Sequence, residues 1–245
     1  MTVSKILIVP DAHIPFEDEK AYGLMLKAAR VIKPETVVIL GDFADFMSVS
    51  SFDKSPDQAI QFEYELEKAN ARLDELDALG AKHKYYLCGN HEDRLPRLLK
   101  RQALALYSTL TVAKVLRLKE RGWHYSHYGD HITIGKVSYT HDTGNLGPYA
   151  HIRSGQVFES SVVHGHTHYA GVGYFGNARG DTHVAIQSGW LGGKKAAEYL
   201  SQIKQSRNWQ HGFTFGYKEL GGETHLQFIP IIKGVCWVDG KRISA

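Results

Sequence analysis

The chain has 245 residues and only two cysteines, Cys88 and Cys236. Two cysteines cannot form the disulfide framework of a small secreted protein, and a free cysteine usually lies in the core. No apolar run approaches the roughly 20 residues needed to span a bilayer, and Ile6–Val9 is too short for a secretion signal. We therefore expect a soluble, cytoplasmic protein without a membrane partner.

The sequence also has little net charge, +3 at pH 7. So small a value gives no argument that the chain as a whole binds nucleic acid. Internal repeats, low-complexity segments and linker-like stretches are absent too. A chain of this length can bury one substantial core, so we expect a single domain over residues 1–245. The oligomeric state does not follow from the sequence.

The first half of the chain alternates strand-like and helix-like segments. Strands are expected at Lys5–Pro10, Thr36–Leu40 and Lys84–Cys88. A helix is expected at Glu17–Ile32, and a second one is capped by Ser55 and ended by Gly80, with apolar residues at helical spacing. Strands and helices that alternate in this way predict a parallel sheet.

The second half reads as short strands after a helical stretch from Leu95 to about Glu120. The expected strands are Trp123–Tyr128, His131–Ile134, Val137–Thr140, Ser161–His164, Thr182–Gln187, Thr214–Lys218, Thr224–Pro230 and Gly234–Val238. Gly135-Lys136 suits a tight hairpin turn, and a short helix is expected at Gly193–Gln205. The pattern indicates one α/β domain with two sheets and outer helices.

Aspartate, histidine and asparagine residues gather just past the ends of the expected strands, where open α/β sheets place their sites. Five blocks share this position: Asp11-Ala-His13, Gly41-Asp42-Phe-Ala-Asp45, Gly89-Asn90-His91-Glu92, His141-Asp142 and Gly165-His166-Thr-His168. Asp11 and His13, two residues apart in an extended chain, point to the same side. Each block alone is weak evidence for a metal site.

Taken in order, the blocks resemble the D-x-H, G-D-x-x-D, G-N-H-E, H and G-H-x-H motifs of the calcineurin-like metallophosphoesterases, in a small bacterial or phage-type form. They span Asp11 to His168, about two thirds of the chain. The resemblance implies a four-layer α/β/β/α sandwich, with two central mixed sheets flanked by helices. It also implies hydrolysis of a phosphate ester by a water activated between two divalent cations.

The resemblance further implies which residues hold the two ions. The ligands of one metal are matched by Asp11, His13, Asp42 and His168. Those of the other are matched by Asp42, Asn90, His141 and His166, with Asp42 shared between them. Mixed oxygen and imidazole ligands suit Mn, Fe, Zn, Ni or Co, and of these we expect manganese.

His91 is implied to be a catalytic residue that faces the substrate, with Asp45 behind it. A carboxylate in that place keeps an imidazole protonated and correctly turned. Two positions depart from the family pattern. His141 is followed by Asp142 where the family usually has glycine, and Asp45 is followed by Phe46 where the protein-phosphatase branch has arginine.

A basic segment follows His91. Residues 94–121 hold eight basic side chains and one acidic one, a net charge of +7, which leaves −4 for the rest. A helix beginning at Pro96 would bury Leu95, Leu98, Leu99 and Leu106. Arg94, Arg97 and Arg101 would share another face. That face is either simply solvated or a substrate-binding funnel for a polyanion such as nucleic acid or a nucleotide.

The other aromatic and histidine residues carry weaker signals. Trp190, Trp209 and Phe213 could stack on a base, although core positions are more common for such residues. We expect packing or surface roles for the nine histidines outside the blocks, at positions 83, 124, 127, 131, 151, 164, 183, 211 and 225. His164 is expected to support the metal ligands rather than to be one.

Three functions are compatible with the sequence. The basic segment favours a phosphodiesterase or nuclease acting on nucleic acid or a nucleotide. The alternative is a phosphomonoesterase acting on a small metabolite or a phosphoprotein. A metal-binding scaffold without catalysis is disfavoured, because the ligand set, His91 and Asp45 are all present.

Overall fold

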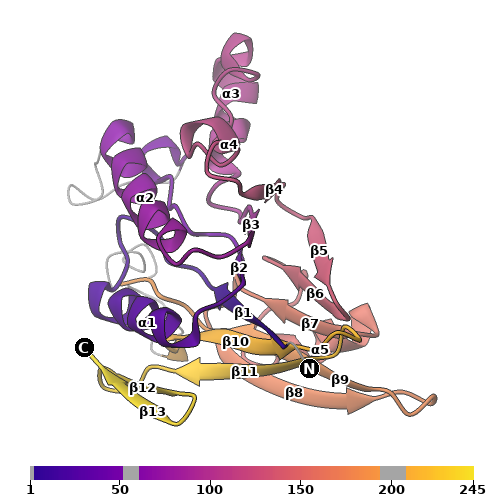
Figure 1. Cartoon of the computed structure of the whole chain (residues 1–245). Coiled ribbons are helices and arrows are strands. Elements are labelled where there is room, and N and C mark those ends of the chain that lie inside the picture. The colour runs from indigo at the N-terminus through magenta and orange to yellow at the C-terminus, as the bar shows by residue number, and fades with distance from the viewer. Residues whose placement is uncertain (1–2, 52–60, 194–207) are drawn as a thin grey trace.

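The structure is a computed structural model that describes residues 3–51, 61–193 and 208–245. Its larger sheet has six strands, which in spatial order are β11 (Thr224–Pro230), β10 (Gly212–Lys218), β1 (Ser4–Val9), β2 (Thr36–Ile39), β3 (His83–Leu87) and β4 (His124–Ser126). The β1 to β4 strands are parallel, and β10 is antiparallel to β1 and β11. The sheet is therefore mixed, with the expected parallel order in its first half (Figure 1).

The second sheet has five strands. In spatial order they are β5 (His131–Ile134), β6 (Val137–Thr140), β7 (Ser161–His164), β9 (Thr182–Ser188) and β8 (Ala170–Gly176). The β5–β6 hairpin turns at Gly135 as expected, and β6, β7 and β9 are parallel. A separate hairpin is formed by β12 (Val235–Val238) and β13 (Lys241–Ser244).

Helices cover the outer face of each sheet. Helix α1 (Glu19–Ile32) begins two residues later than expected, because Asp18 caps it by accepting from two backbone N–H groups. Helix α2 (Phe62–Asp77) lies beside it. The Ser55 cap was a wrong prediction for this helix, because α2 begins after Gln61, whose backbone is extended; Ser55 itself lies outside the described residues. Helix α5 (Ala150–Phe158) packs on β7, β9 and β8 of the second sheet.

The helical stretch expected from Leu95 to Glu120 is not one helix. It divides into α3 (Arg94–Gln102), a turn of 3-10 helix at Leu104–Leu106 and α4 (Val112–Val115). Leu95 and Leu99 are buried as expected, but Leu106 is 46% exposed because the helix ends before it. In Figure 1 the α3 helix projects away from the two sheets.

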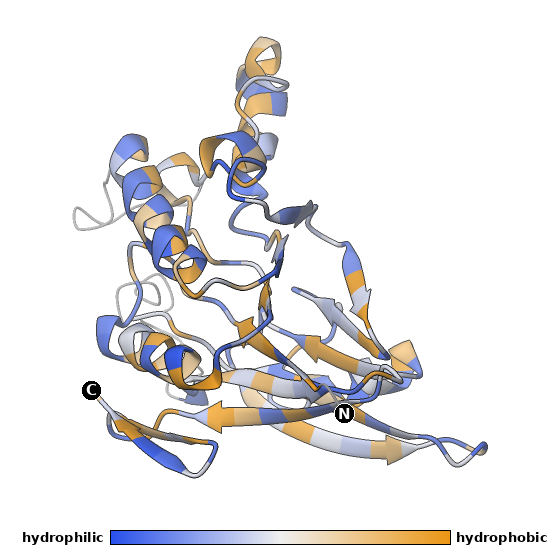
Figure 2. Ribbon diagram, viewed as in Figure 1, coloured by the Kyte–Doolittle hydropathy of each residue, from blue (hydrophilic) through white to orange (hydrophobic). Residues whose placement is uncertain are grey.

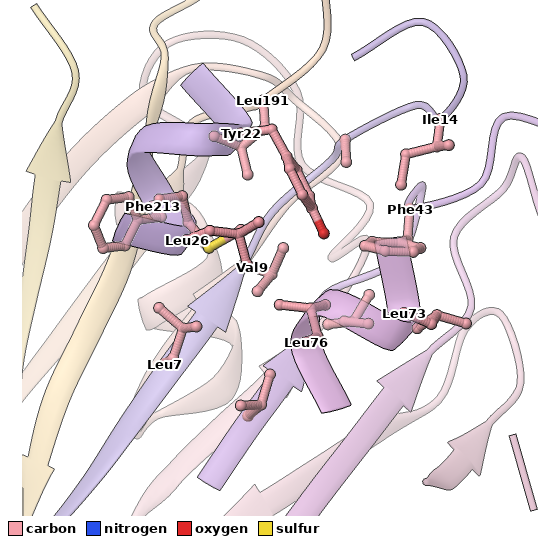
Figure 3. Packing of buried hydrophobic residues seen from close by; sticks show 14 of the residues in the cluster. Leu7, Val9, Ile14, Tyr22, Leu26, Phe43, Leu73, Leu76, Leu191 and Phe213 are labelled. Carbon is pink, nitrogen blue, oxygen red and sulfur yellow. The ribbon is translucent and has the colours of Figure 1, made fainter. Parts of the chain in front are cut away.

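Alternate residues of the central strands face two different cores. Leu7 and Val9 pack with Tyr22 and Leu26 of α1 and with Leu73 of α2 (Figure 3). The intervening residues point the other way, toward the second sheet, and form a core that includes Ile6, Ile8, Val38, Leu40, Tyr139, Val163 and Ile186. In Figure 2 the central strands are mostly hydrophobic and the helices are of mixed character. The four-layer α/β/β/α prediction is confirmed.

The expected strands are all present, with ends within two residues of the prediction. Besides a turn of 3-10 helix at Met47–Val49, three described strands or α-helices were missed. The β8 sequence is rich in glycine, α5 contains Gly155, and β13 is mostly polar, so each has a weak local signal. The helix expected at Gly193–Gln205 lies, except for Gly193, outside the described residues. Among the described residues, no helix has the length and apolar character needed to cross a membrane.

Candidate metal centre

The five blocks meet at one edge of the sandwich, because each follows a parallel strand of one of the two sheets. The loops after β1, β2 and β3 carry Asp11, His13, Asp42, Asp45, Asn90 and His91. The loops after β6 and β7 carry His141, His166 and His168. Two groups of side chains within them have the arrangement of metal ligands: Asp11, His13, Asp42 and His168, and Asp42, His141 and His166. These are the sets that the sequence suggested, apart from Asn90.

The first group is fully buried and tightly spaced. The Nε2 atom of His13 lies 3.0 Å from Nε2 of His168, which in turn lies 3.1 Å from Oδ2 of Asp11. Two imidazole nitrogens and a carboxylate oxygen thus converge on one point. Such a convergence of acceptors is what a cation with mixed nitrogen and oxygen ligands requires.

Asn90 lies beside the second group, with its amide oxygen between two imidazoles. Its Oδ1 atom lies 3.0 Å from Nε2 of His141 and 2.9 Å from Nδ1 of His166. His141 also holds its Nδ1 against the carbonyl oxygen of Leu40 at 3.0 Å. A backbone carbonyl at that nitrogen fixes the tautomer that leaves Nε2 free for a metal.

Asp42 lies between the two groups. Its Oδ2 atom is 3.4 Å from Nε2 of His141 and 4.0 Å from Nε2 of His13. Its Oδ1 atom accepts the backbone N–H of His91 at 2.9 Å. Asp42 is therefore the one carboxylate among the predicted ligands that both groups share.

Glu92 holds the loop that carries Asp42, a role the sequence did not suggest. Its buried carboxylate accepts the backbone N–H groups of Asp42, Phe43, Ala44 and Gly89, all at 2.8–3.0 Å, and the hydroxyl of Tyr86 at 2.8 Å. Five donors on one carboxylate lock the β2 and β3 loops together. The signal available in the sequence was an acid inside the Gly89–Glu92 block that has no assigned role as a metal ligand.

The close approach of these loops depends on glycine. A Cβ atom at Gly89 would lie 2.1 Å from Oδ1 of Asp42, and one at Gly165 would lie 2.3 Å from Oδ1 of Asp11. Four of the predicted ligands, His13, Asp42, His166 and His168, have φ between 47° and 66°. Left-handed backbone costs about 1–3 kcal/mol at each non-glycine residue, and such strain concentrates at functional sites.

Asp45 contacts three predicted site residues. Its Oδ2 atom lies 3.0 Å from Nδ1 of His13 and 3.1 Å from Nδ1 of His91, and its Oδ1 accepts from Nη1 of Arg94 at 2.9 Å. His13, Asp45 and His91 could in principle form a third metal group. With both Nδ1 atoms donating to the carboxylate, however, their Nε2 atoms are the ones directed toward the other ligands.

The cluster shifts the pKa of its histidines in two directions. Burial opposes protonation of His141, but Asp42 and Asp11 outweigh it and raise the pKa of His141 to about 10. Burial likewise opposes protonation of His91, but Asp42 and Asp45 outweigh it and raise the pKa of that imidazole. Burial and the neighbouring His91 lower the pKa of His13 and keep it in the neutral form that binds metal.

One buried atom supports the fit of a cation directly. Oδ1 of Asp11 has no hydrogen-bond partner within the described part of the chain, although the residue is fully buried. Such an unpaired buried oxygen is costly unless something else satisfies it. The donor set and this oxygen together fit a divalent metal.

A cavity of about 340 Å³ opens beside the second group, and we call it the arginine cavity. It is lined by Arg94, Arg97, Arg101, Tyr128, Asn90, His166 and residues 49–51. Arg97 and Arg101 are exposed, which fits both a substrate-binding face and a solvated one. Arg94 differs from the prediction, because its guanidinium turns inward to Asp45 and to Nε2 of His91, 3.2 Å away.

The rest of the basic segment does not act as one surface. Arg121 forms ion pairs with Asp74 and Asp77 of α2, and Arg117 donates to Asn70. These contacts fasten residues 117–121 to a helix. Only the arginines of α3 line the cavity beside the metal ligands.

Asp142, where the family usually has glycine, stands at the edge of the second group. Its Oδ2 atom accepts the hydroxyl of Tyr128 at 3.0 Å and lies 3.9 Å from Nε2 of His166. Tyr128 lines the arginine cavity, so Asp142 fixes part of its wall. His141 keeps its place beside Asn90 despite this departure.

The three aromatic residues differ in what they can reach. Phe213 is fully buried in the helix-side core, and Trp190 stacks on His168 at 5.0 Å between ring centres with 7% exposure. Neither is open to a base. Trp209 meets the edge of the same cluster, 4.2 Å from His168, and is only partly buried. His164 is buried, contacts Ser154 and is absent from both ligand groups, as predicted.

Comparisons with known proteins agree with this geometry. A family model described as calcineurin-like phosphoesterase matches residues 4–221. The chain is 26% identical to the Gene 54 protein of Mycobacterium phage L5 over 265 residues, which cover 97% of each chain. It is also 26% identical over 259 residues to the Gene 54 protein of Mycobacterium phage D29, covering 96% of this chain and 97% of that one.

Two solved structures are similar at lower identity. One is a single mutant of Vps29 from Entamoeba histolytica, with 14% identity, a TM-score of 0.47 and coverage of 98% of this chain and 99% of that one. The other is Yfce, a phosphoesterase from E. coli, with 15% identity, a TM-score of 0.43 and coverage of 98% and 97%.

Proposed function

Because the chain belongs to the calcineurin-like phosphoesterase family, we propose that it is a two-metal phosphodiesterase whose substrate is nucleic acid or a nucleotide. Family membership and the His/Asp groups support a metal-dependent hydrolase of phosphate esters in general. The number of ions, their identity as manganese and the diester substrate belong to the proposal.

In this proposal Asp42 is shared by two ions. One would be held by Asp11, His13, Asp42 and His168, and the other by Asp42, Asn90, His141 and His166. When bound, two divalent ions activate water and offset the charge of the phosphate. The chain's own residues bind the ions, orient the phosphate and control one proton.

His91 is the residue that would handle the proton. Its Nδ1 is held by Asp45, and its Nε2 lies 3.7 Å from Oδ2 of Asp42, so this second nitrogen faces the ligand cluster. From there it would protonate the leaving oxygen or stabilise a phosphoryl oxygen. Arg94, 3.2 Å from the same nitrogen, would add positive charge for the phosphate.

The arginine cavity is the observation that carries the choice of substrate. Asn90 and His166 of the second ligand group line the same cavity as Arg94, Arg97 and Arg101. A phosphate between the ions would therefore have a cationic cavity on one side. That arrangement suits a substrate with more than one phosphate, because arginine binds phosphate oxygens bidentately.

A substrate panel tests the proposal. Bis-p-nitrophenyl phosphate, p-nitrophenyl phosphate, single-stranded DNA, double-stranded DNA and cyclic nucleotides would each be assayed with Mn, Ni, Zn and Mg. We expect hydrolysis of the diesters to exceed that of the monoester, with manganese among the active metals. Preference for the monoester would favour the phosphomonoesterase alternative, and inactivity throughout would favour a scaffold.

A further inference from the structure

A second cavity also has His166 in its wall. It has a volume of about 410 Å³ and is lined by Leu146, Pro148, His166, Thr167, Tyr169 and Trp209, together with Gly147. We call it the aromatic cavity. His166 lines both this cavity and the arginine cavity, so both adjoin the second ligand group.

The two cavities differ in chemistry. Three arginines line the first. Among the described residues that line the second, His166 is the only imidazole, and there is no acid, lysine or arginine. Leu146 is 65% exposed at the rim. Apart from His166, these residues offer an anionic group no cationic side chain, while a flat uncharged ring would find aromatic and apolar walls.

The walls of the aromatic cavity are held in place by buried bonds. The side chain of Gln187, fully buried, donates to the carbonyl oxygen of Gly147 at 3.0 Å and to Oγ1 of Thr167 at 2.8 Å. Another wall residue, Trp209, packs against Trp190 at 4.9 Å between ring centres. The cavity is therefore a formed feature of the fold rather than a loose gap between loops.

We propose that the aromatic cavity seats a nucleobase of the diester substrate, stacked against Tyr169 or Trp209. This inference rests on the proposed function. A phosphodiester held at His166 has two ester arms. The arginine cavity suits an arm that carries further phosphates, and the aromatic cavity suits an arm that carries a base. Bases in a duplex stay stacked and paired, so the substrate is a single-stranded polynucleotide or a nucleotide diester.

Two chromogenic diesters with one leaving group test the base seat. Thymidine 5′-(p-nitrophenyl phosphate) carries a base, and methyl p-nitrophenyl phosphate does not. The Tyr169→Ala and Leu146→Glu variants should lower kcat/KM for the thymidine ester by about 5- to 150-fold, the value of one lost base stack. The methyl ester should be cleaved at an unchanged rate.

The control is Val157→Glu, which places the same charge on an exposed residue that does not line the cavity. Trp209 is left unchanged because it packs against His168. If the parent protein cleaves both esters and neither variant alters their ratio, the base seat is wrong while the phosphodiesterase function stands. If it cleaves neither ester, the phosphodiesterase function fails.

Binding distinguishes the two ideas even without turnover. A fluorescent oligothymidylate should bind more tightly than an abasic oligomer of equal length, measured by anisotropy. That advantage should disappear in Tyr169→Ala and Leu146→Glu and persist in Val157→Glu. Equal affinity of the parent protein for both oligomers would overturn the base seat.

Discussion

Nδ1 of His91 lies 3.1 Å from Oδ2 of Asp45, and both side chains are buried. The same oxygen is 3.0 Å from Nδ1 of His13. One carboxylate thus orients a proposed acid and a proposed metal ligand, which links proton transfer to metal binding. It also explains why burial, although it favours the neutral carboxyl, is outweighed by His91 and His13 in lowering the pKa of Asp45.

Replacing His91 and Asp45 should separate these two roles. His91→Ala should lower kcat by roughly 10²–10⁴-fold and leave metal content unchanged. Asp45→Asn should lower kcat as well and weaken metal binding by about 10- to 100-fold, because it also orients His13. Steady-state rates and bound metal per chain would be measured together. Full activity in His91→Ala would remove the acid role.

Asp42 and Asn90 should differ in how many ions they hold. A chelator should abolish activity and added manganese should restore it. Asn90→Ala should weaken the binding of one ion, whereas Asp42→Ala should weaken the binding of both, since both ligand groups share that carboxylate. Metal per chain would be measured by inductively coupled plasma mass spectrometry. A single ion in the parent protein at saturating manganese would contradict the two-metal proposal.

Neutralising Arg97 and Arg101 to Gln should raise KM for single-stranded DNA and reduce the dependence on salt. Each lost phosphate contact lowers the slope of log affinity against log salt concentration by about one. The matched control is Lys114→Gln with Lys119→Gln, which removes equal charge from exposed residues that do not line the arginine cavity. Equal slopes in the two double variants would indicate that this helix face is simply solvated and does not bind the substrate.

Glu65 should make stability depend on pH. Burial and the nearby Asp45 raise its pKa to about 7, against hydrogen bonds from Ser48 and Met47 that oppose the shift. Because the folded pKa exceeds the ordinary value, the stabilisation is present below about pH 4.5 and is lost as the pH rises through about 7.

The measurement is urea unfolding of the parent protein and Glu65→Gln at pH 5 and pH 8. Gln cannot titrate, so the parent should lose up to about 3 kcal/mol relative to the variant between these pH values. A stability difference that does not change with pH would show that Glu65 stays in one protonation state across this range.

The sequence by itself determined the fold class, most of the strands and the predicted ligand residues. Strand periodicity is local, so the ends of the β1 and β6 strands could be located from it. Asp11, Asp42 and His141 follow such ends, and parallel strands bring their carboxyl ends to one edge. The roles of these residues, the native metal and the cytoplasmic location stay predictions.

Tertiary structure alone decided what depends on contacts between distant residues. Helical spacing placed Arg94 with Arg97 and Arg101, but the buried charge of Asp45, 49 residues away in sequence, turns Arg94 inward. Trp190 is likewise buried and stacked on His168, so it is not available to stack on a ligand. The division between a cationic and an aromatic cavity arises only where loops from both sheets meet at His166, because no local pattern encodes which side chains will face each other there.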